Sequence, residues 1–151
     1  MSDEQKAPQI AIQKVFIKDA SYECSDGHEV FKLDKWQPEI KLDLNTATRK
    51  TGDDQYEVYL KVNVAAVQDE KTIFMVEIEQ GGLFHVAGIE GEELKRVLAA
   101  FCPGILYPYA REAVDSLVLK GGFPPVVLAP VNFDALYVQA QQQEAAQGQE
   151  H

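Results

Sequence analysis

The sequence predicts an α+β fold, and two observations lead to it. Several extended segments, most of them with alternating apolar and polar residues, occur between residues 9 and 87. Beyond Gly88 the apolar residues recur at helical spacing instead. Strand patterns therefore come first and helix patterns follow, which is typical of α+β rather than α/β chains. No internal repeat divides the chain, so we expect one folded domain.

The first extended segment is "QIAIQKVFIKDASYE", which is rich in the β-branched and aromatic residues that favour strands. Its alternation slips between Ile12 and Val15, so a bulge or bend is expected there. "CSDGHE" then has the Asp-Gly content of a turn. The next segment mixes loop and extended character until Ile40, Leu42 and Leu44 alternate with polar residues.

The clearest strands follow. "YEVYLKVNVAAV" places the apolar side chains of Tyr56, Val58, Leu60, Val62 and Val64 on one face. After the polar connection "QDEK", a second strand points Phe74, Val76 and Ile78 inward and Met75, Glu77 and Glu79 outward. This pattern predicts an antiparallel meander with one face in water.

Two helices are expected next. "GEELKRVLAAF" begins with acidic residues, "CPG" is expected to interrupt it, and "ILYPYAREAVDSLVLK" forms a second helix that Gly121 and Gly122 end. Pro108 should kink this helix or mark a late start. The apolar residues between Ile105 and Leu119 cover more than one helix face, which predicts a subunit interface as well as a core contact.

The C-terminal part begins with the apolar, proline-rich stretch "GGFPPVVLAPV", and a short helix is expected from about Asn132. The Gln-rich end lacks an apolar stripe and is predicted to be disordered. The domain prediction is therefore a flexible N-terminus at 1–8, one folded domain at 9–142 and a disordered tail at 143–151.

Composition limits the function. The 151 residues carry 24 Asp and Glu against 14 Lys and Arg, a net charge of −10, and this excess disfavours a nucleic-acid partner. We expect no export signal, because the first residues carry charges where a secretory signal has its apolar core. We expect no membrane span, because no apolar run is long enough to cross a bilayer. Cys24 and Cys102 suit a reducing cytoplasm, so we expect a soluble cytoplasmic protein.

Catalytic patterns are nearly lacking. The three histidines are scattered, and no phosphate-binding glycine loop or nucleophile elbow is present, so we expect no metal, no cofactor and no enzyme. Cys102 could act as a nucleophile near a helix start, but a buried core thiol is the preferred interpretation. Glu77 and Glu79 share a strand face, as paired catalytic carboxylates require, yet solvation or a partner's binding site explains them better.

The apolar residues outside a core pattern favour binding instead. Trp36 lies in the charged stretch "DKWQPE", five residues after Phe31, and can serve as a core anchor or line a groove. The proline-rich stretch is extended without offering a full set of backbone donors, so it can form the wall of a groove.

Several blocks resemble one family. "KWQPEIKLDLNT", "DDQYEVYLKVNV", "EQGGLFHVAGIEG", "FCPGILYPYARE" and "LAPVNFDALY" occur in the order found in the SecB family of bacterial export chaperones, and the resemblance runs from about Gln9 to about Gln143. It implies a four-stranded antiparallel sheet with helices packed on one face, assembled as a dimer of dimers. It further implies an ATP-independent cytoplasmic chaperone that binds unfolded precursors of exported proteins and delivers them to the motor ATPase SecA.

The resemblance also implies two sets of site residues. The SecA-binding surface corresponds to Asp19, Glu23, Met75 and Glu77. The groove for client chains corresponds to Phe31, Trp36, Leu42, Leu44, Phe123, Phe133 and Tyr137.

Two other functions remain open on sequence grounds. One is a SecB-like chaperone or adaptor dedicated to a toxin–antitoxin system. The other is a small hydrolase that uses Cys102 or the carboxylates of Glu77 and Glu79, for which no second catalytic group is apparent.

Overall fold

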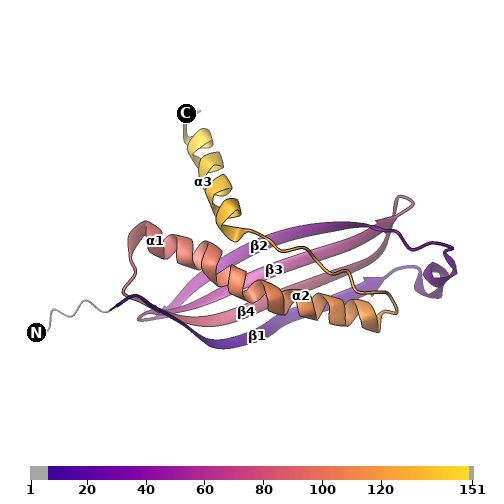
Figure 1. Cartoon of the computed structure of the whole chain (residues 1–151), viewed down its shortest axis with the longest axis horizontal. Helices are drawn as coiled ribbons and strands as arrows, with labels where there is room; N and C mark the ends of the chain where they lie inside the picture. The colour runs from indigo at the N-terminus through magenta and orange to yellow at the C-terminus, as the bar shows by residue number, and fades with distance from the viewer. Residues whose placement is uncertain (1–6, 150–151) are drawn as a thin grey trace, which may run out of the picture.

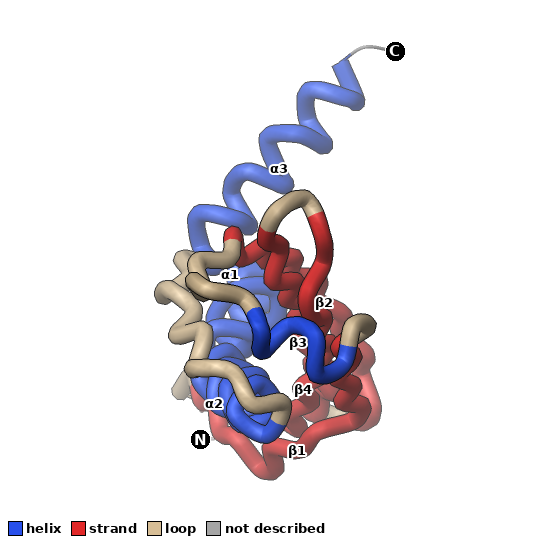
Figure 2. Tube along the Cα trace, turned by 90° about the vertical axis from the view of Figure 1, so that its right-hand side faces the viewer, coloured by secondary structure: helices blue, strands red, loops and turns tan. Residues whose placement is uncertain are grey.

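The computed structural model describes residues 7–149 and has two layers, a sheet and helices that cover one of its faces (Figures 1 and 2). The strands are β1 (Gln9–Cys24), β2 (Glu39–Gly52), β3 (Gln55–Gln68) and β4 (Lys71–Ala87). They form one four-stranded antiparallel sheet in the order β1-β4-β3-β2. The predicted α+β class and the helices on one face are confirmed, whereas most of the predicted flexible N-terminus lies outside the described residues.

The core lies between the two central strands and the longest helix, α2 (Cys102–Lys120). Many of its largest fully buried side chains come from the alternate positions of β3 and β4 that the meander pattern predicts: Val58, Leu60, Val62, Val64, Phe74, Val76 and Ile78. Phe84 and Val86, farther along β4, are fully buried as well. From α2, Leu106, Ala110, Val114 and Val118 are fully buried against them. Burial of side chains of this size stabilises the fold by about 1.5–3 kcal/mol each.

Two glycines in the middle of β4 allow close approach on both faces of the sheet. A Cβ at Gly82 would lie 2.8 Å from Leu106 Cδ2, so this glycine lets α2 settle onto the strand. A Cβ at Gly81 would lie 2.6 Å from the Phe16 ring, which packs edge-on against Tyr59 on the opposite face. The two adjacent glycines therefore leave room for Leu106 of α2 on one face of the sheet and for Phe16 on the other.

The edge strand β1 has the bulge that the sequence predicts and a second one that it does not. Its pairing with β4 shifts register between Ile12 and Lys14, and again between Ile17 and Asp19. The buried side chain of Gln80 donates a hydrogen bond to the Phe16 carbonyl at 3.0 Å. This bond holds the second bulge against β4. The alternation pattern of β1 alone does not predict this bulge, because the bonding partner, Gln80, lies on another strand.

The predicted interruption at "CPG" is wrong. Helix α1 (Gly91–Arg96) continues through a π-helical segment (Val97–Phe101) directly into α2. The Cys102 amide donates to the carbonyl of Val97, five residues back. This wider turn stands immediately before Pro103, whose ring would crowd a regular α-turn, so the helix passes through the proline instead of stopping.

Helix α2 ends where the sequence predicts, in a Schellman motif. Gly122 has a φ of 91°, a conformation that favours glycine. The Gly122 amide donates to the Leu119 carbonyl at 3.0 Å, and the Phe123 amide donates to the Val118 carbonyl at 3.1 Å. Pro108 lies inside the continuous helix, so the alternative of a late start is wrong.

The last helix, α3 (Phe133–Gln149), begins where predicted but is longer than predicted and points away from the sheet (Figure 1). The Asn132 side chain caps it by accepting a hydrogen bond from the Ala135 amide at 3.0 Å. Residues 143–149 are helical, which contradicts the disordered tail predicted there; Gln, Ala and Glu are good helix formers even without an apolar stripe. Residues 150–151 of that tail lie outside the described residues.

Candidate functional site

The outer face of the sheet, opposite the helices, carries a row of acidic side chains. Cross-strand pairing sets Asp19 beside Glu79, Ser21 beside Glu77 and Glu23 beside Met75. A shallow depression of about 300 Å³ opens among Ser21, Glu23, Asn63, Met75, Val76 and Glu77. We call this site the acidic depression.

Three of the four residues implied for SecA binding line this depression, and Asp19 lies one cross-strand row beyond it. Met75 is 52% exposed, although its neighbours Phe74 and Val76, which point to the other face of β4, are buried. An exposed Met between carboxylates gives the site an apolar centre with a negative rim, which suits a partner that combines basic and apolar groups.

Lysines already lie among these carboxylates. The Lys61 ammonium is 2.7 Å from Glu77 Oε1, and the Lys18 ammonium is 3.6 Å from Glu79 Oε1. The hydrogen bond to Glu77 is the main cause that raises the pKa of Lys61, and the charges of Glu79 and Asp19 add to it. The pattern of outward residues did not single out Lys61, because its role appears only once β3 is placed beside β4.

A third ion pair lies on this face farther along the sheet. Arg49 Nη2 lies 2.9 Å from Glu57 Oε2, and the Tyr59 hydroxyl donates to the same carboxylate at 3.2 Å. The hydrogen bond from Arg49 is the main cause that lowers the pKa of Glu57. Glu57 is thus satisfied within the chain, whereas Glu23 forms no ion pair with any residue in 7–149.

An aromatic cluster occupies the other side of the sheet at one end of α2. It is made by Tyr22, Phe31, Trp36, Phe74 and Phe123. The ring centroids of Trp36 and Phe123 are 4.8 Å apart, those of Phe31 and Phe123 are 5.2 Å apart, and those of Phe74 and Phe123 are 5.0 Å apart. Phe31 is 56% exposed and Trp36 is half-buried, so the cluster has a buried base and an open top.

Trp36 is held in this cluster by a residue that sequence reasoning missed. The Gln68 side chain accepts a hydrogen bond from the Gln37 amide at 2.8 Å and donates one to the Lys35 carbonyl at 2.8 Å. Gln68 therefore clamps the backbone on both sides of Trp36 from the end of β3. The sequence placed it in a polar connection, where its partners 31 and 33 residues away could not be seen.

The other four residues implied for the client groove lie outside this cluster. Leu42 and Leu44 lie opposite Val64 and Val62 on the helix side of β2, and both keep part of their surface exposed. Phe133 is buried, with its ring centroid 5.8 Å from that of Tyr107, and Tyr137 follows it on α3. The structure thus joins Phe31, Trp36 and Phe123, and places Phe133 and Tyr137 where α3 meets the helical layer.

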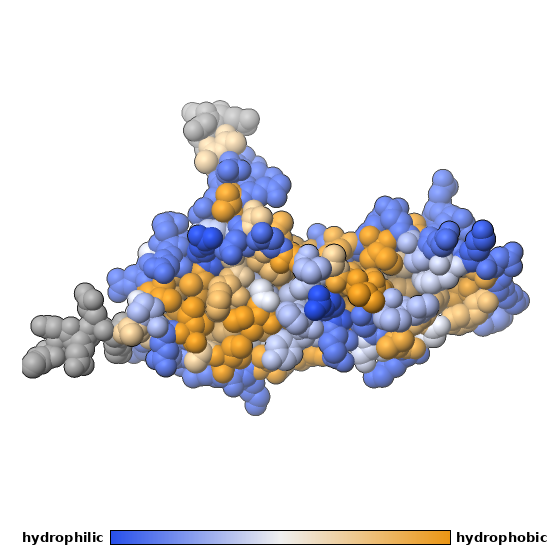
Figure 3. Space-filling model, in the orientation of Figure 1, coloured by the Kyte–Doolittle hydropathy of each residue, from blue (hydrophilic) through white to orange (hydrophobic). Residues whose placement is uncertain are grey.

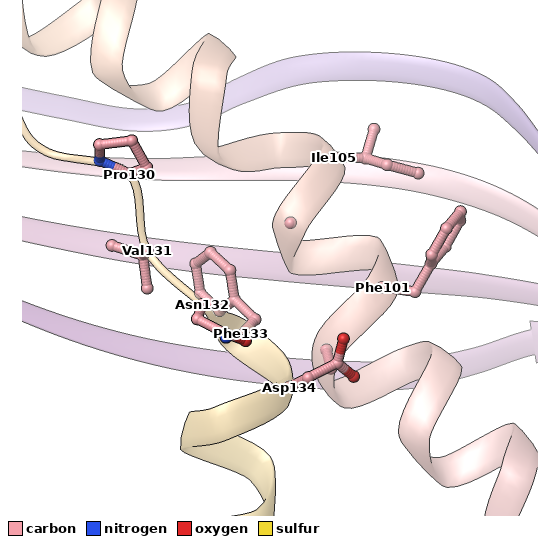
Figure 4. A pocket seen from close by; sticks show the side chains of 9 residues that line it. Phe101, Ile105, Pro130, Val131, Asn132, Phe133 and Asp134 are labelled. Carbon is pink, nitrogen blue, oxygen red and sulfur yellow. The ribbon is translucent and has the colours of Figure 1, made fainter.

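An apolar groove lies beside that junction. Its volume is about 570 Å³, and it opens between the start of α2 and the chain that enters α3. Phe101 and Ile105 extend from the helix, while Pro130 and Val131 approach from the connecting segment and Phe133 from the first residue of α3 (Figure 4). Apolar residues also cover the surface over the first half of α2 (Figure 3). Phe101 and Tyr109 are about half exposed, so this helix keeps an apolar outer side.

The hydrolase hypothesis gains no catalytic pair. Cys102 is fully buried, and this burial raises the pKa of its thiol to about 12, so no thiolate forms near neutrality. Glu77 is engaged by Lys61 rather than by a second carboxyl group. Within residues 7–149, no group of three or more His, Cys, Asp and Glu side chains is arranged to hold a metal ion.

Comparison with known proteins identifies the family. The model of the family described as preprotein translocase subunit SecB matches residues 3–144. The chain belongs to the SecB family. A protein-export protein SecB of Marinobacter nauticus is 50% identical over 148 residues, covering 96% of this chain and 89% of that protein. The SecB family is one of chaperones for protein export, not one of enzymes.

A solved SecB-like chaperone shares the fold. It comes from Mycobacterium tuberculosis and was solved with a peptide of the HigA1 antitoxin. The TM-score is 0.68 at 19% identity, and the match covers 81% of this chain and 90% of that one. No helix within residues 7–149 is long and apolar enough to cross a membrane.

Proposed function

We propose that this protein is an ATP-independent cytoplasmic chaperone that binds unfolded precursors of exported proteins and delivers them to SecA. Membership of the SecB family carries this proposal. Two surfaces of different chemistry support it, because the open aromatic cluster lies on the helix side and the acidic depression on the opposite face.

Client chains would bind at the aromatic cluster and along the helix side of β2. Phe31 and Trp36 present exposed ring surface above the buried rings of the cluster. This surface can make apolar contacts with an unfolded chain. Leu42 and Leu44 extend this apolar surface along the edge strand. Phe133 and Tyr137 would join the same groove only if a neighbouring subunit brought its α3 close.

The assembly would be a homotetramer, built as a dimer of dimers. The exposed apolar side of the continuous helix supports this, because Phe101 in the π-helical segment and Tyr109 and Leu119 in α2 are each about half exposed in one chain. An apolar surface of this kind is typical of an interface. Light scattering at micromolar concentration should give the mass of four chains, and a monomer would contradict the proposed assembly.

SecA would bind at the acidic depression through Asp19, Glu23, Met75 and Glu77. Glu77→Lys reverses one charge on the negative rim of this site, and a like charge facing a basic partner costs several kcal/mol. Because the Glu77 side chain is 38% exposed on the outer face and its ion pair lies at the surface, its replacement should change the free energy of unfolding by only about 0.5 kcal/mol. We therefore expect SecA binding to be lost while client binding and the tetramer remain.

Two titrations on the same variant test this, one with SecA and one with a permanently unfolded protein. Glu39→Lys is the matched control, because Glu39 is an exposed carboxylate at the start of β2 and forms no ion pair within residues 7–149. Equal loss in both titrations of Glu77→Lys would show that the two surfaces are not separate. Unchanged SecA binding would show that the partner binds elsewhere.

The alternative of a chaperone dedicated to a toxin–antitoxin system has less support. The SecB-like chaperone solved with an antitoxin peptide is 19% identical to this chain, a level that shows the fold alone. The 50% identity to a protein-export protein favours export. Binding of an antitoxin encoded beside this protein's gene, together with failure to bind export precursors, would reverse this preference.

A further inference from the structure

Lys61 lies among the acidic side chains on the outer face of the sheet. It forms an ion pair with Glu77, the residue on which the proposed partner binding depends. Its ammonium lies 2.7 Å from Glu77 Oε1, and the two side chains are 44% and 38% exposed. Register places Lys61 directly beside Glu79 and one row from Glu77, while Asp19 lies on the far side of Glu79. Lys61 is thus a cation among three carboxylates, and one of them, Glu77, lines the acidic depression.

A partner that binds Glu77 through a basic group must compete with this internal ion pair. The pair is partly exposed, so it can open without leaving a buried charge behind. Once displaced, the Lys61 ammonium stays among the same carboxylates and repels an incoming cation. Asn63, the neighbour of Glu77 on β3, carries no charge and offers no such competition.

We infer that Lys61 is a built-in counter-ion that weakens binding of a basic partner at the acidic depression and so keeps that contact reversible. The inference rests on the proposed function, and it adds a residue that sets the strength of the partner contact. A chaperone that delivers a client must then dissociate from the partner that receives it. Lys61 favours this dissociation because it competes with the partner for the Glu77 carboxylate. Lys18 forms a similar but longer ion pair with Glu79, at 3.6 Å.

The test measures the SecA dissociation constant by calorimetry at one low salt concentration for a set of full-length variants. Lys61→Met removes the competing cation but keeps the apolar stem, and it should tighten binding roughly two- to five-fold, the worth of an exposed ion pair. Lys61→Gln is a second variant with the same expectation. Lys61→Arg keeps the charge and should bind as the natural protein does.

Lys41→Met is the matched control for total charge. Lys41 is an exposed strand residue on the same sheet face, opposite Ala65, and it forms no ion pair with any described residue. Its replacement changes the net charge by the same amount but frees no carboxylate, so it should tighten binding less than Lys61→Met. An equal gain would show that only total charge matters and would overturn the inference.

A Glu77→Gln background separates this inference from the proposed function. Glu77→Gln alone should weaken SecA binding, and the gain from Lys61→Met should shrink in that background because no Glu77 charge is left to free. Weaker or unchanged binding by Lys61→Met, while Glu77→Gln still weakens binding, overturns the counter-ion role and leaves the proposed site standing. No effect of Glu77→Gln overturns the site itself, and the counter-ion role with it.

Discussion

Val127 holds a backbone conformation that its side chain disfavours, and replacing it should stabilise the protein. Its φ is 52°, in the left-handed region, and its side chain is 70% exposed. The flanking chain fixes this bend, because Asp115 Oδ1 accepts hydrogen bonds from the Val126 amide at 2.8 Å and the Val127 amide at 3.4 Å. Phe123 and Leu128 are buried on either side and anchor the segment.

The expected gain from Val127→Gly follows from opposing terms. An L-residue in this conformation costs roughly 1–2 kcal/mol, and a β-branched one lies at the upper end. Glycine removes that cost but adds about 0.4–1 kcal/mol of conformational entropy to the unfolded chain. Since little Val127 surface is buried, the net gain should be about 0.5–1 kcal/mol, or roughly 2–4 °C in the unfolding midpoint.

The assay is thermal and urea unfolding followed by circular dichroism, at one protein concentration because the midpoint of an oligomer depends on it. Val126→Gly is the matched control: Val126 is half-buried, has no positive φ and shares the same Asp115 acceptor. It should lose about 1–2 kcal/mol through lost burial and added chain entropy. Similar destabilisation by both variants would refute the strain argument.

Other predictions concern the aromatic cluster and the buried thiol. Gly121→Ala should destabilise by about 1–3 kcal/mol, because the added Cβ would overlap the Tyr22 hydroxyl, and Gly52→Ala is the control at an exposed glycine, since its Cβ would lie 3.7 Å from Gln55 in ordinary contact and its φ is not positive. Gln68→Ala should release Trp36, seen as a red shift in the emission of this single tryptophan, whereas Gln55→Ala should leave the emission unchanged. Burial raises the pKa of Cys102 from 9.0 to about 12, so its contribution to stability is complete below about pH 9 and is lost as the pH rises toward 12. At pH 8 a maleimide should therefore modify the partly exposed Cys24 and spare Cys102, and equal labelling of both would contradict the packing of α2.

The sheet could be predicted from the sequence because each central strand has one wet and one dry face. Alternation in residues 56–64 and 74–79 identifies the inward and outward sets, and it placed Met75 and Glu77 on the outer face correctly. The Gly pair that ends α2 was equally readable, since only glycine suits the conformation at Gly122.

Other features depend on contacts that no local pattern reveals. The continuous passage from α1 to α2 requires a π-helical turn before Pro103, whereas proline rules alone predict a stop. Gln68 and Lys61 act through partners on other strands or loops, so their roles appear only in the folded chain. The length of α3 was missed because a helix without an apolar stripe gives no periodic signal.

The most direct test of the central claim is native mass spectrometry with a permanently unfolded protein and with its folded form, both without ATP. The proposed function predicts a tetramer that binds the unfolded chain and leaves the folded form unbound. Replacement of Trp36 by Ala should reduce the bound fraction, while Glu77→Lys should leave it unchanged. A monomer that binds neither form, or a tetramer that binds both equally, would contradict the claim that this protein holds unfolded chains.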